Sequence, residues 1–303
     1  MYEKLFSKTG LSLERLRTFC EIAEARGISK AARGKPHAQS QYSRQLKELE
    51  SNLGAQLFER RGNGIHITEA GKRLLPLCKE FFVSLELIVG EFHQLPKKIS
   101  IGAGESILDW LVLPRLKQLE QFLPNTHIEL INLRSQAINA AILDGDLDLG
   151  IVRHNACSRQ LGTRQLGILN YCLFVPREMY NAAKTSSPVD LLKKLPLARL
   201  AGDGEFNQML AKVAERKKLT LNTRLTCSSF PSMKEAVKRG HVAAVLPTIA
   251  EVDLPRGEFE KVSVPLFGAL NRQFVLCFNK RLIAVRAYQE QALEKFVKLF
   301  EIP

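Results

Sequence analysis

Residues 39–54 read QSQYSRQLKELESNLG, and the alternation of apolar and polar side chains in this stretch decides how the N-terminal region folds. Its apolar residues recur at intervals of four, three and four positions: Tyr42, Leu46, Leu49 and Leu53. This spacing predicts one face of an α-helix that stops at Gly54. The opposite face carries amide, hydroxyl and cationic groups: Gln39, Ser40, Ser43, Arg44 and Lys47. One face can therefore pack on a core while the other offers hydrogen-bond donors.

Two shorter helical patterns precede this stretch. The first is broken at Gly27 and presents an apolar stripe at helical spacing: Leu13, Leu16, Cys20 and Ala23. The second begins at Ser29 and is closed by Gly34 and Pro36. A short helix, a tight turn and a helix with a polar N-terminal face are typical of a helix-turn-helix, whose second helix reads base edges in the major groove.

Positive charge accompanies this pattern. From Arg26 to Lys47 the chain has six lysine or arginine residues and no aspartate or glutamate, and the whole chain of 303 residues carries a formal net charge of +13. Such an excess favours a polyanion, either nucleic acid or, less often, an anionic membrane surface. Charge alone also fits a solvated face on a small helical bundle. The helix-turn-helix pattern is what favours DNA.

The segment after Gly54 predicts a β-hairpin. Two short strand patterns, at 57–61 and 65–67, flank the sequence Gly-Asn-Gly, and an Asn-Gly pair is typical of a tight hairpin turn. A hairpin directly after a recognition helix is a wing, from which Arg60 and Arg61 can reach the DNA backbone or a narrow minor groove. The alternative for Arg61 is a solvated residue that only keeps the hairpin soluble.

Residues 13–75 resemble the winged helix-turn-helix of the LysR-type transcriptional regulators. The matching stretches are GISKAA at 27–32, SRQLKELESNLGAQLFER at 43–60 and ITEAG at 67–71. The resemblance implies DNA contacts from the polar helix face: Gln39, Ser40, Ser43 and Arg44. Lys47 and the two wing arginines, Arg60 and Arg61, are expected to hold the DNA backbone.

The chain also departs from the family in this helix. Ala38 stands where a serine usually caps the helix, and Gln41 stands where alanine is common. The operator sequence is therefore expected to be unusual.

A long helical pattern follows at 68–96, with Thr68 as its expected N-cap. Its apolar residues alternate between intervals of four and three, which is the seam of a coiled coil: Leu74, Cys78, Phe81, Leu85, Ile88, Phe92 and Leu95. The narrow seam favours a dimer over a helix that lies on the chain's own C-terminal domain, and it resembles the LysR linker helix. A two-fold dimer places two recognition helices on successive major grooves of a palindromic operator.

Residues 97–303 alternate short apolar runs with amphipathic stretches, which predicts βα units around a mixed sheet. Three strands and two intervening helices come first: strands at 99–104, 128–133 and 147–152, and helices at 105–122 and 136–143. Two successive βαβ crossovers make these strands parallel.

A second α/β lobe is expected from residues 173–176 onward, and the chain returns to the first lobe near 274–278. The second lobe holds helices and a strand at 206–217, 231–239 and 242–246, and an amphipathic helix at 284–300 ends the chain. The resulting boundaries are about 97–165 and 268–303 for lobe I and about 166–267 for lobe II.

Two lobes joined by two crossings leave a cleft for a ligand. Ligands of parallel sheets bind at the C-terminal strand ends, where the candidates are Ser106, Arg134, Ser135 and Arg153. The region resembles the LysR effector domain, which shares the fold of periplasmic solute-binding proteins, through LVLP at 111–114, DGDLDLGI at 144–151 and VKRGHVAAVLP at 237–247. The resemblance implies an inducer site at Gly104, Glu105, Ser106, Arg153, Asp203, Ser228, Ser229 and Phe230. For each residue the alternative is a solvated loop or a helix cap.

The sequence offers no catalytic, metal or cofactor site. The six cysteines lack metal-ligand or redox-pair spacing and indicate free thiols in a reducing compartment. The GAGE stretch at 102–105 lacks the third glycine of a dinucleotide fingerprint. The first residues, MYEKLFSKTG, have no apolar signal core, and no run approaches the ~20 apolar residues of a membrane helix. A cytoplasmic protein without a membrane partner is expected.

These patterns predict a multidomain, DNA-binding transcription regulator that is not an enzyme. Its expected parts are a winged helix-turn-helix at 1–67, a linker and dimerisation helix at 68–96, and a two-lobed α/β effector-binding domain of periplasmic-binding-protein type at 97–303. The expected partners are double-stranded DNA, a small-molecule inducer, further copies of the chain in a homodimer or homotetramer, and RNA polymerase. The alternatives are a constitutive regulator without ligand response and, from other classes, an enzyme or a solute receptor fused to a DNA-binding head.

Overall fold

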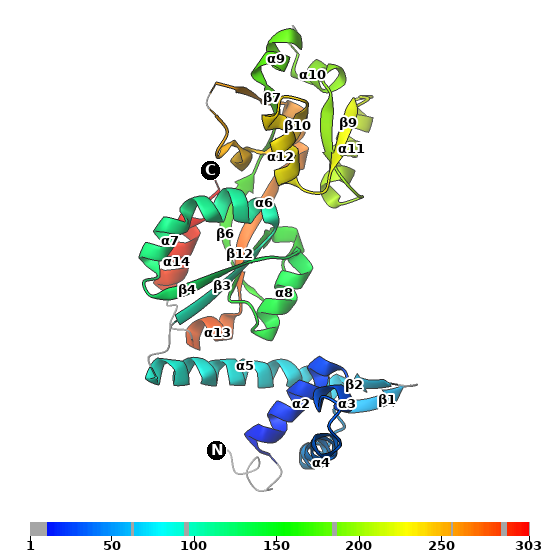
Figure 1. Ribbon diagram of the computed structural model, residues 1–303, viewed down its shortest axis with the longest axis vertical. Helices are drawn as coiled ribbons and strands as arrows, with labels where there is room; N and C mark the ends of the chain where they lie inside the picture. The colour runs from blue at the N-terminus through cyan, green and yellow to red at the C-terminus, as the bar shows by residue number, and fades with distance from the viewer. Residues whose placement is uncertain are drawn as a thin grey trace. The chain divides into compact units, whose positions relative to one another are not determined.

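The computed structural model describes residues 11–61, 64–93, 97–183, 187–255, 257–285 and 290–302. The chain divides into two compact units, Met1–Leu95 and Pro96–Pro303 (Figure 1). Among the described residues, no helix is long and apolar enough to cross a membrane.

The N-terminal unit follows the order of elements that the sequence predicts. Its described elements are α2 (Leu13–Ala25), α3 (Ile28–Ala31), α4 (Pro36–Leu53), β1 (Phe58–Arg61), β2 (Gly64–Ile67) and α5 (Glu69–Phe92). The two strands pair antiparallel with Phe58 opposite Ile67 and Arg61 opposite Gly64. The expected hairpin is therefore confirmed, although the predicted turn residues 62–63 lie outside the described residues.

Helix α4 begins earlier than the sequence pattern indicates. The expectations that Pro36 closes the preceding helix and that this helix starts near Gln39, with Ala38 at the cap position, are wrong, because Pro36 is the first residue of α4 and Lys35 precedes it as the N-cap. Proline suits this position, since its missing N–H would have no partner in the first turn and its fixed φ is helical. Lys35 makes no side-chain cap hydrogen bond, so the helix start relies on proline rather than on a hydroxyl.

The core of the N-terminal unit forms where the helices meet the hairpin. Phe19 and Leu49 are fully buried, and the Phe19 ring lies 5.5 Å from the ring of Phe58. The Glu50 carboxylate accepts hydrogen bonds from the backbone N–H groups of Leu57, at 2.7 Å, and Phe58, at 3.2 Å. This carboxylate ties the end of α4 to the start of the wing and fixes the helix relative to the hairpin.

Helix α5 serves two purposes along its length. The Thr68 hydroxyl accepts a hydrogen bond from the N–H of Gly71 at 3.1 Å, which confirms the expected N-cap. Cys78 is buried in the unit's own core and Leu74 packs against that core, so these two residues of the predicted pairing seam are used inside the unit. Further along, the seam is exposed up to Phe92, whose side chain is 81% exposed. Leu95, at the end of the seam, lies outside the described residues.

Lobe I of the C-terminal unit is built on one five-stranded sheet in the order β4-β3-β5-β12-β6. Its strands are β3 (Lys97–Ala103), β4 (Thr126–Asn132), β5 (Leu149–Arg153), β6 (Gly162–Leu169) and β12 (Arg272–Phe278). Strand β3 runs parallel to β4 and β5, as the two crossovers predict, and β12 runs antiparallel to β5 and β6. The sheet is therefore mixed, as expected.

The helices of lobe I are less regular than their sequence pattern predicts. They are α6 (Glu105–Ile107), the π-helical turn η1 (Leu108–Val112), the 3₁₀ turn η2 (Leu113–Arg115), α7 (Leu116–Phe122), α8 (Ser135–Asp144), the 3₁₀ turn η3 (His154–Ala156), α13 (Lys280–Val285) and α14 (Glu290–Leu299). The helix expected at 105–122 changes its turn type around Pro114, whose ring disfavours regular α-helical bonding to the preceding turn. The single C-terminal helix expected at 284–300 is instead described as α13 and α14, with residues 286–289 outside the described part.

Lobe II has its own five-stranded sheet in the order β11-β7-β10-β8-β9. Its strands are β7 (Tyr171–Pro176), β8 (Leu197–Leu200), β9 (Thr223–Cys227), β10 (Ala243–Pro247) and β11 (Phe259–Val262). Its helices are α9 (Arg177–Ala183), α10 (Pro188–Lys194), α11 (Glu205–Arg216), α12 (Phe230–Lys238) and the 3₁₀ turns η4 (Thr248–Glu251) and η5 (Pro265–Leu270). Because β6 belongs to the first sheet up to Leu169 and β12 starts at Arg272, both crossings lie a few residues later than the expected 165 and 268.

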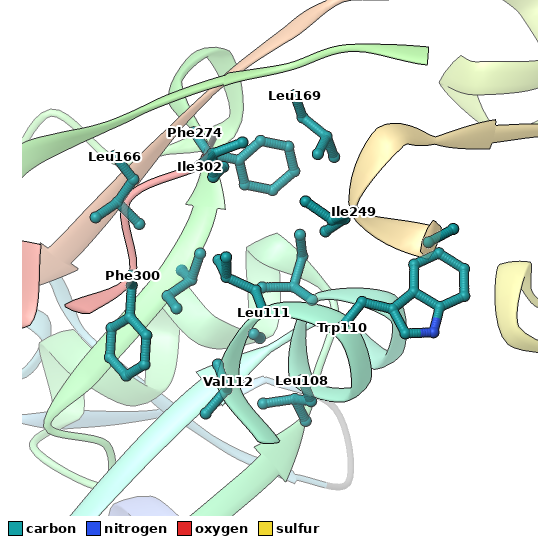
Figure 2. Close-up of a cluster of buried hydrophobic side chains, with 14 of the residues drawn as sticks. Leu108, Trp110, Leu111, Val112, Leu166, Leu169, Ile249, Phe274, Phe300 and Ile302 are labelled. Carbon is teal, nitrogen blue, oxygen red and sulfur yellow. The ribbon is translucent and has the colours of Figure 1, made fainter. Parts of the chain in front are cut away.

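The two lobes share one apolar cluster. Figure 2 shows Ile249 of lobe II facing Trp110 and Leu111 of lobe I, beside Leu169 and Phe274 near the crossings. The Nζ atom of Lys234, on α12, also lies 5.2 Å from the centre of the Trp110 ring. The lobes are therefore packed together at this level rather than separated by an open cleft.

Candidate nucleic-acid interface and inter-lobe site

The polar face of α4 forms one shallow surface in the N-terminal unit. It is lined by Pro36, Gln39, Ser40, Ser43, Arg44, Lys47 and Glu48. All five residues predicted on this face are therefore brought together, and all except the half-buried Ser43 are exposed. The surface begins at the N-terminal end of the helix, where free backbone N–H groups and the helix dipole favour an anion.

Glu48 is a residue of this surface that the sequence reasoning missed. Its Oε1 accepts a hydrogen bond from Arg44 Nε at 2.8 Å, and its Oε2 accepts one from Arg15 on α2. The hydrogen bond from Arg44, followed by that from Arg15, lowers the pKa of the Glu48 carboxyl, and the same pairing raises the pKa of Arg44. The spacing of four residues between Arg44 and Glu48 was a visible signal for such a pair. Glu48 thus orients the guanidinium of Arg44 through this hydrogen bond.

The two wing arginines differ. Arg60 is exposed on β1, whereas Arg61 Nη2 lies 2.7 Å from Glu59 Oε1 in an ion pair between exposed side chains. The pair with Glu59 offsets part of the charge of Arg61, which agrees with the alternative of a solvated hairpin residue. The strand pairing places Arg60 opposite Ile65 and Glu59 opposite His66, so Arg60 and Arg61 point to different faces of the hairpin.

An apolar stripe runs along the exposed side of α5. It consists of Leu77, Phe81, Leu85, Ile88, Val89 and Phe92. Four of these residues were predicted from the seam, and Leu77 and Val89 extend it. An exposed apolar surface of this kind is a candidate interaction site.

The nine predicted effector residues occupy helix starts and loop ends in the C-terminal unit. Gly104 is the N-cap of α6, and α6, which contains Glu105 and Ser106, packs against α12. The Ser229 hydroxyl caps α12 by accepting a hydrogen bond from the N–H of Ser232 at 3.3 Å. Ser229 therefore acts as a helix cap, which was the alternative to a role in inducer binding.

The remaining predicted residues are more scattered. Arg134 is the exposed N-cap of α8, and Asp203 and Ser228 lie in exposed turns before α11 and α12. Phe230 begins α12 and Arg153 ends β5. Of these five, Arg153 and Phe230 take part in a cluster at the junction of the lobes.

The centre of this cluster is Glu205, the first residue of α11 in lobe II. Its Oε2 lies 2.8 Å from Arg272 Nη1 and is also paired with Arg153 Nη1, and its Oε1 accepts a hydrogen bond from Asn155 Nδ2 at 3.2 Å. Both arginines and the asparagine belong to lobe I. A single carboxylate thus links the two lobes through two guanidinium groups.

Aromatic rings border these charges. The ring centres of Tyr171 and Phe206 are 5.2 Å apart, and those of Phe206 and Phe230 are 4.9 Å apart. Burial lowers the pKa of Arg153, and the positive charge of Arg272 adds to this effect. Burial also raises the pKa of the Tyr171 hydroxyl. The two arginines therefore repel each other in a partly desolvated site.

Glu205, Arg272, Tyr171 and Asn155 were missed by the sequence reasoning. An acidic residue in the first turn of a helix and a basic residue before an apolar strand each have ordinary explanations, so neither stands out in the chain. Their importance depends on contacts between residues 153, 205 and 272, which only the tertiary fold brings together.

The cysteines are free, as expected from their spacing. Cys20 and Cys78 are buried in the N-terminal unit, and the hydrogen bond between the two thiols, followed by burial, raises the pKa of Cys20. Cys277 is buried beside Cys157 in lobe I, and the same causes raise its pKa.

A winged helix-turn-helix with an exposed polar helix face, followed by a two-lobed α/β unit, defines a DNA-binding transcription regulator. Two family models match the chain: "Bacterial regulatory helix-turn-helix protein, lysR family" over residues 13–72, and "LysR substrate binding domain" over residues 93–297. The chain belongs to the LysR family of transcriptional regulators. This membership sets the enzyme alternative aside, because the family consists of regulators.

Similar proteins agree with this assignment. The chain is 27% identical over 249 residues to the HTH-type transcriptional regulator HdfR of Yersinia enterocolitica, an alignment that covers 81% of this chain and 84% of the relative. Its fold is similar to a full-length cysteine variant of OxyR from Pseudomonas aeruginosa, with a TM-score of 0.65, 20% identity and coverage of 96% and 95% of the two chains. It is also similar to full-length LysG from Corynebacterium glutamicum with bound effector Arg, with a TM-score of 0.63, 16% identity and coverage of 94% and 99%. These likenesses confirm the predicted fold class.

Proposed function

We propose that this LysR-family regulator reads a palindromic operator as a homodimer that pairs further into a homotetramer, under the control of a small molecule bound between its lobes. The observation that carries the DNA-binding part is the exposed polar face at the N-terminal end of α4. Transcriptional control places the protein with bacterial DNA in the cytoplasm and makes RNA polymerase a further partner.

Base reading falls to Gln39, Ser40, Ser43 and Arg44 in this proposal. Amide and guanidinium groups can make two hydrogen bonds each to the edge of a purine, and hydroxyl groups adapt to several bases. Lys47 and the wing arginines, Arg60 and Arg61, contact phosphates, which position the helix without selecting sequence. The ion pair with Glu59 makes Arg61 the weaker of the two wing contacts.

Pairing of two copies is assigned to the exposed stripe on α5, whose predicted members are Phe81, Leu85, Ile88 and Phe92. Leu74 and Cys78 support this helix from inside the unit and contribute indirectly. Burying the stripe against a second copy removes apolar surface from water, which is the main favourable term in such associations.

Control by a small molecule is the second part of the proposal. It is supported by the two-lobed architecture and by the meeting of charged groups from both lobes at Glu205. LysG, the relative in fold, holds an effector, Arg. The competing candidate is a constitutive regulator, and one observation favours it: the Glu205 carboxylate already pairs with both arginines at the lobe junction.

Mobility-shift titrations test the DNA-binding part. The DNA is the region upstream of the chain's own gene, and the key variant is Arg44→Ala. Losing a two-hydrogen-bond contact to a base costs about 1–3 kcal/mol, so specific affinity should fall roughly 5- to 150-fold. Arg216→Ala, at an exposed position near the end of α11 in the other unit, is the matched control and should bind as the unaltered protein does. Unchanged affinity for Arg44→Ala would show that α4 is not the reading helix.

A further inference from the structure

The cluster at the lobe junction has more positive than negative charge. Arg153 and Arg272, both in lobe I, share one oxygen of the Glu205 carboxylate. The neighbours that face this trio are the neutral amide of Asn155, the hydroxyl of Tyr171, which is hydrogen-bonded with Arg272, and the rings of Tyr171, Phe206 and Phe230. Two guanidinium groups against one carboxylate leave one positive charge uncompensated among these side chains.

Arg272 has hydrogen-bonding capacity that the protein does not use. Its side chain is only 7% exposed, and a guanidinium has five N–H donors. Nη1 reaches Glu205, and Nη2 points at the Met209 sulfur at 3.2 Å, which is a weak acceptor. Within the described part of the chain, the buried Nε has no hydrogen-bond partner. Buried polar groups nearly always find partners, so this arrangement is suited to a further acceptor.

Glu205 can leave this position more easily than the arginines can. Its side chain is 38% exposed at the first turn of α11, whereas Arg272 is enclosed at the start of β12. Rotation of Glu205 toward solvent would leave both arginines in place and facing a border of aromatic rings. A planar carboxylate matches the planar donor pattern of a guanidinium, and a carboxylate, that of Glu205, already occupies this place.

We propose that Arg153 and Arg272 bind the carboxylate of a small organic acid, and that Glu205 is an internal carboxylate that occupies this place until the acid displaces it. This inference rests on the effector-responsive part of the proposed function. The aromatic side chains accept the apolar portion of the acid. Displacement of Glu205 replaces an ion pair between the lobes with contacts to the ligand, and this exchange shifts the balance between lobe arrangements.

The test measures carboxylate binding to the full chain by isothermal titration calorimetry. The probes are sodium acetate, benzoate and succinate, with sodium chloride at matched ionic strength as the reference. Glu205→Gln removes the internal competitor and keeps the size of the side chain. Glu215→Gln, at an exposed position on the same helix, is the matched control. Charge-assisted hydrogen bonds are strong enough that at least one probe should bind Glu205→Gln about tenfold more tightly than the unaltered protein.

A second substitution identifies the binding groups. Arg153→Gln is placed in the Glu205→Gln background, because Arg153 is partly exposed and its charge partner, Glu205, is already neutral there, so its loss unpairs no further charge. The gain in affinity should then disappear. Equal binding of all probes by the unaltered protein and Glu205→Gln would overturn the inference, as would a gain that survives Arg153→Gln.

Mobility shifts with the same protein samples separate this inference from the proposed function. If the carboxylate binds in the expected variant pattern and changes operator affinity, both are supported. If it binds in that pattern but leaves operator affinity unchanged, the carboxylate site stands and control by this ligand fails. If the operator binds while no carboxylate favours Glu205→Gln, the carboxylate site fails and DNA binding stands.

Discussion

The α4 surface and the lobe junction use positive charge in opposite ways. On α4, Arg44 and Lys47 are exposed and Glu48 supports Arg44 from the side. At the lobe junction, Arg272 is buried and an internal carboxylate already holds it. The first arrangement suits a large polyanion that arrives from solvent, and the second suits one small anion that must displace a competitor. Exposed charges are screened by salt much more than buried charges are.

The two sites can be separated most strongly by Ile88→Glu, which should disrupt the pairing of two copies and so weaken only DNA binding. A charge in the middle of the exposed stripe on α5 should dissociate the dimer, because burying an unpaired carboxylate is costly. Operator affinity should fall by about a hundredfold, since two linked reading helices gain at least that much from acting together. Sedimentation velocity and mobility shifts measure the two effects.

The control for this variant is Glu80→Gln on the same helix, which should remain dimeric. Carboxylate binding at the lobe junction should not respond to Ile88→Glu, because the residues of that site lie in the other unit. A dimer that persists in Ile88→Glu would contradict the assignment of the stripe.

A smaller effect is expected on the salt dependence of DNA binding, which should distinguish the exposed charges of α4 from the buried charges of the lobe junction. Replacing Lys47 by alanine should lower the slope of log affinity against log salt by about one unit, because one fewer phosphate contact releases fewer counterions. Mobility shifts across a salt series measure the slope, with Lys217→Ala as the control in the other unit. An unchanged slope would place Lys47 away from the phosphates. Carboxylate binding at the lobe junction should vary much less over the same series.

The smallest effect is expected for Glu48→Gln. The pair of Glu48 with Arg44 is exposed, and such pairs contribute little within a helix. Glutamine can still accept a hydrogen bond from Arg15 on α2, so the variant should lose little stability and change affinity only a few-fold. It should also discriminate less between operator and unrelated DNA, because Arg44 loses the group that orients it. Competition with unrelated DNA measures this, and unchanged discrimination would remove Glu48 from the reading surface.

The parts of the molecule that the sequence predicted correctly depend on neighbours along the chain. The apolar spacing of α4, the hairpin around Gly64 and the Thr68 cap all lie within a few residues of the features that specify them. The start of α4 was misplaced because proline can begin a helix as well as end one, and the pattern weighed only the second use.

Other features depend on contacts that periodicity cannot reveal. A heptad seam has the same appearance whether it packs on its own unit, as Leu74 and Cys78 do, or is exposed, as Phe92 is. Glu205 and Arg272 are 67 residues apart, and no spacing rule connects them. The sequence therefore predicted only two members of the candidate lobe site, Arg153 and Phe230, and missed its central carboxylate, Glu205.

The two roles of α5 have a consequence for how the regulator responds to its own abundance. The first part of the helix packs into the same core as α4, and the rest of the helix carries the exposed stripe. Association of two copies therefore stabilises the same helix on which the reading unit is built, and the melting temperature of that unit rises with protein concentration. In a cell, the regulator at low concentration would be both monomeric and less stable. The specificity of operator recognition would therefore depend on the expression level of the regulator itself.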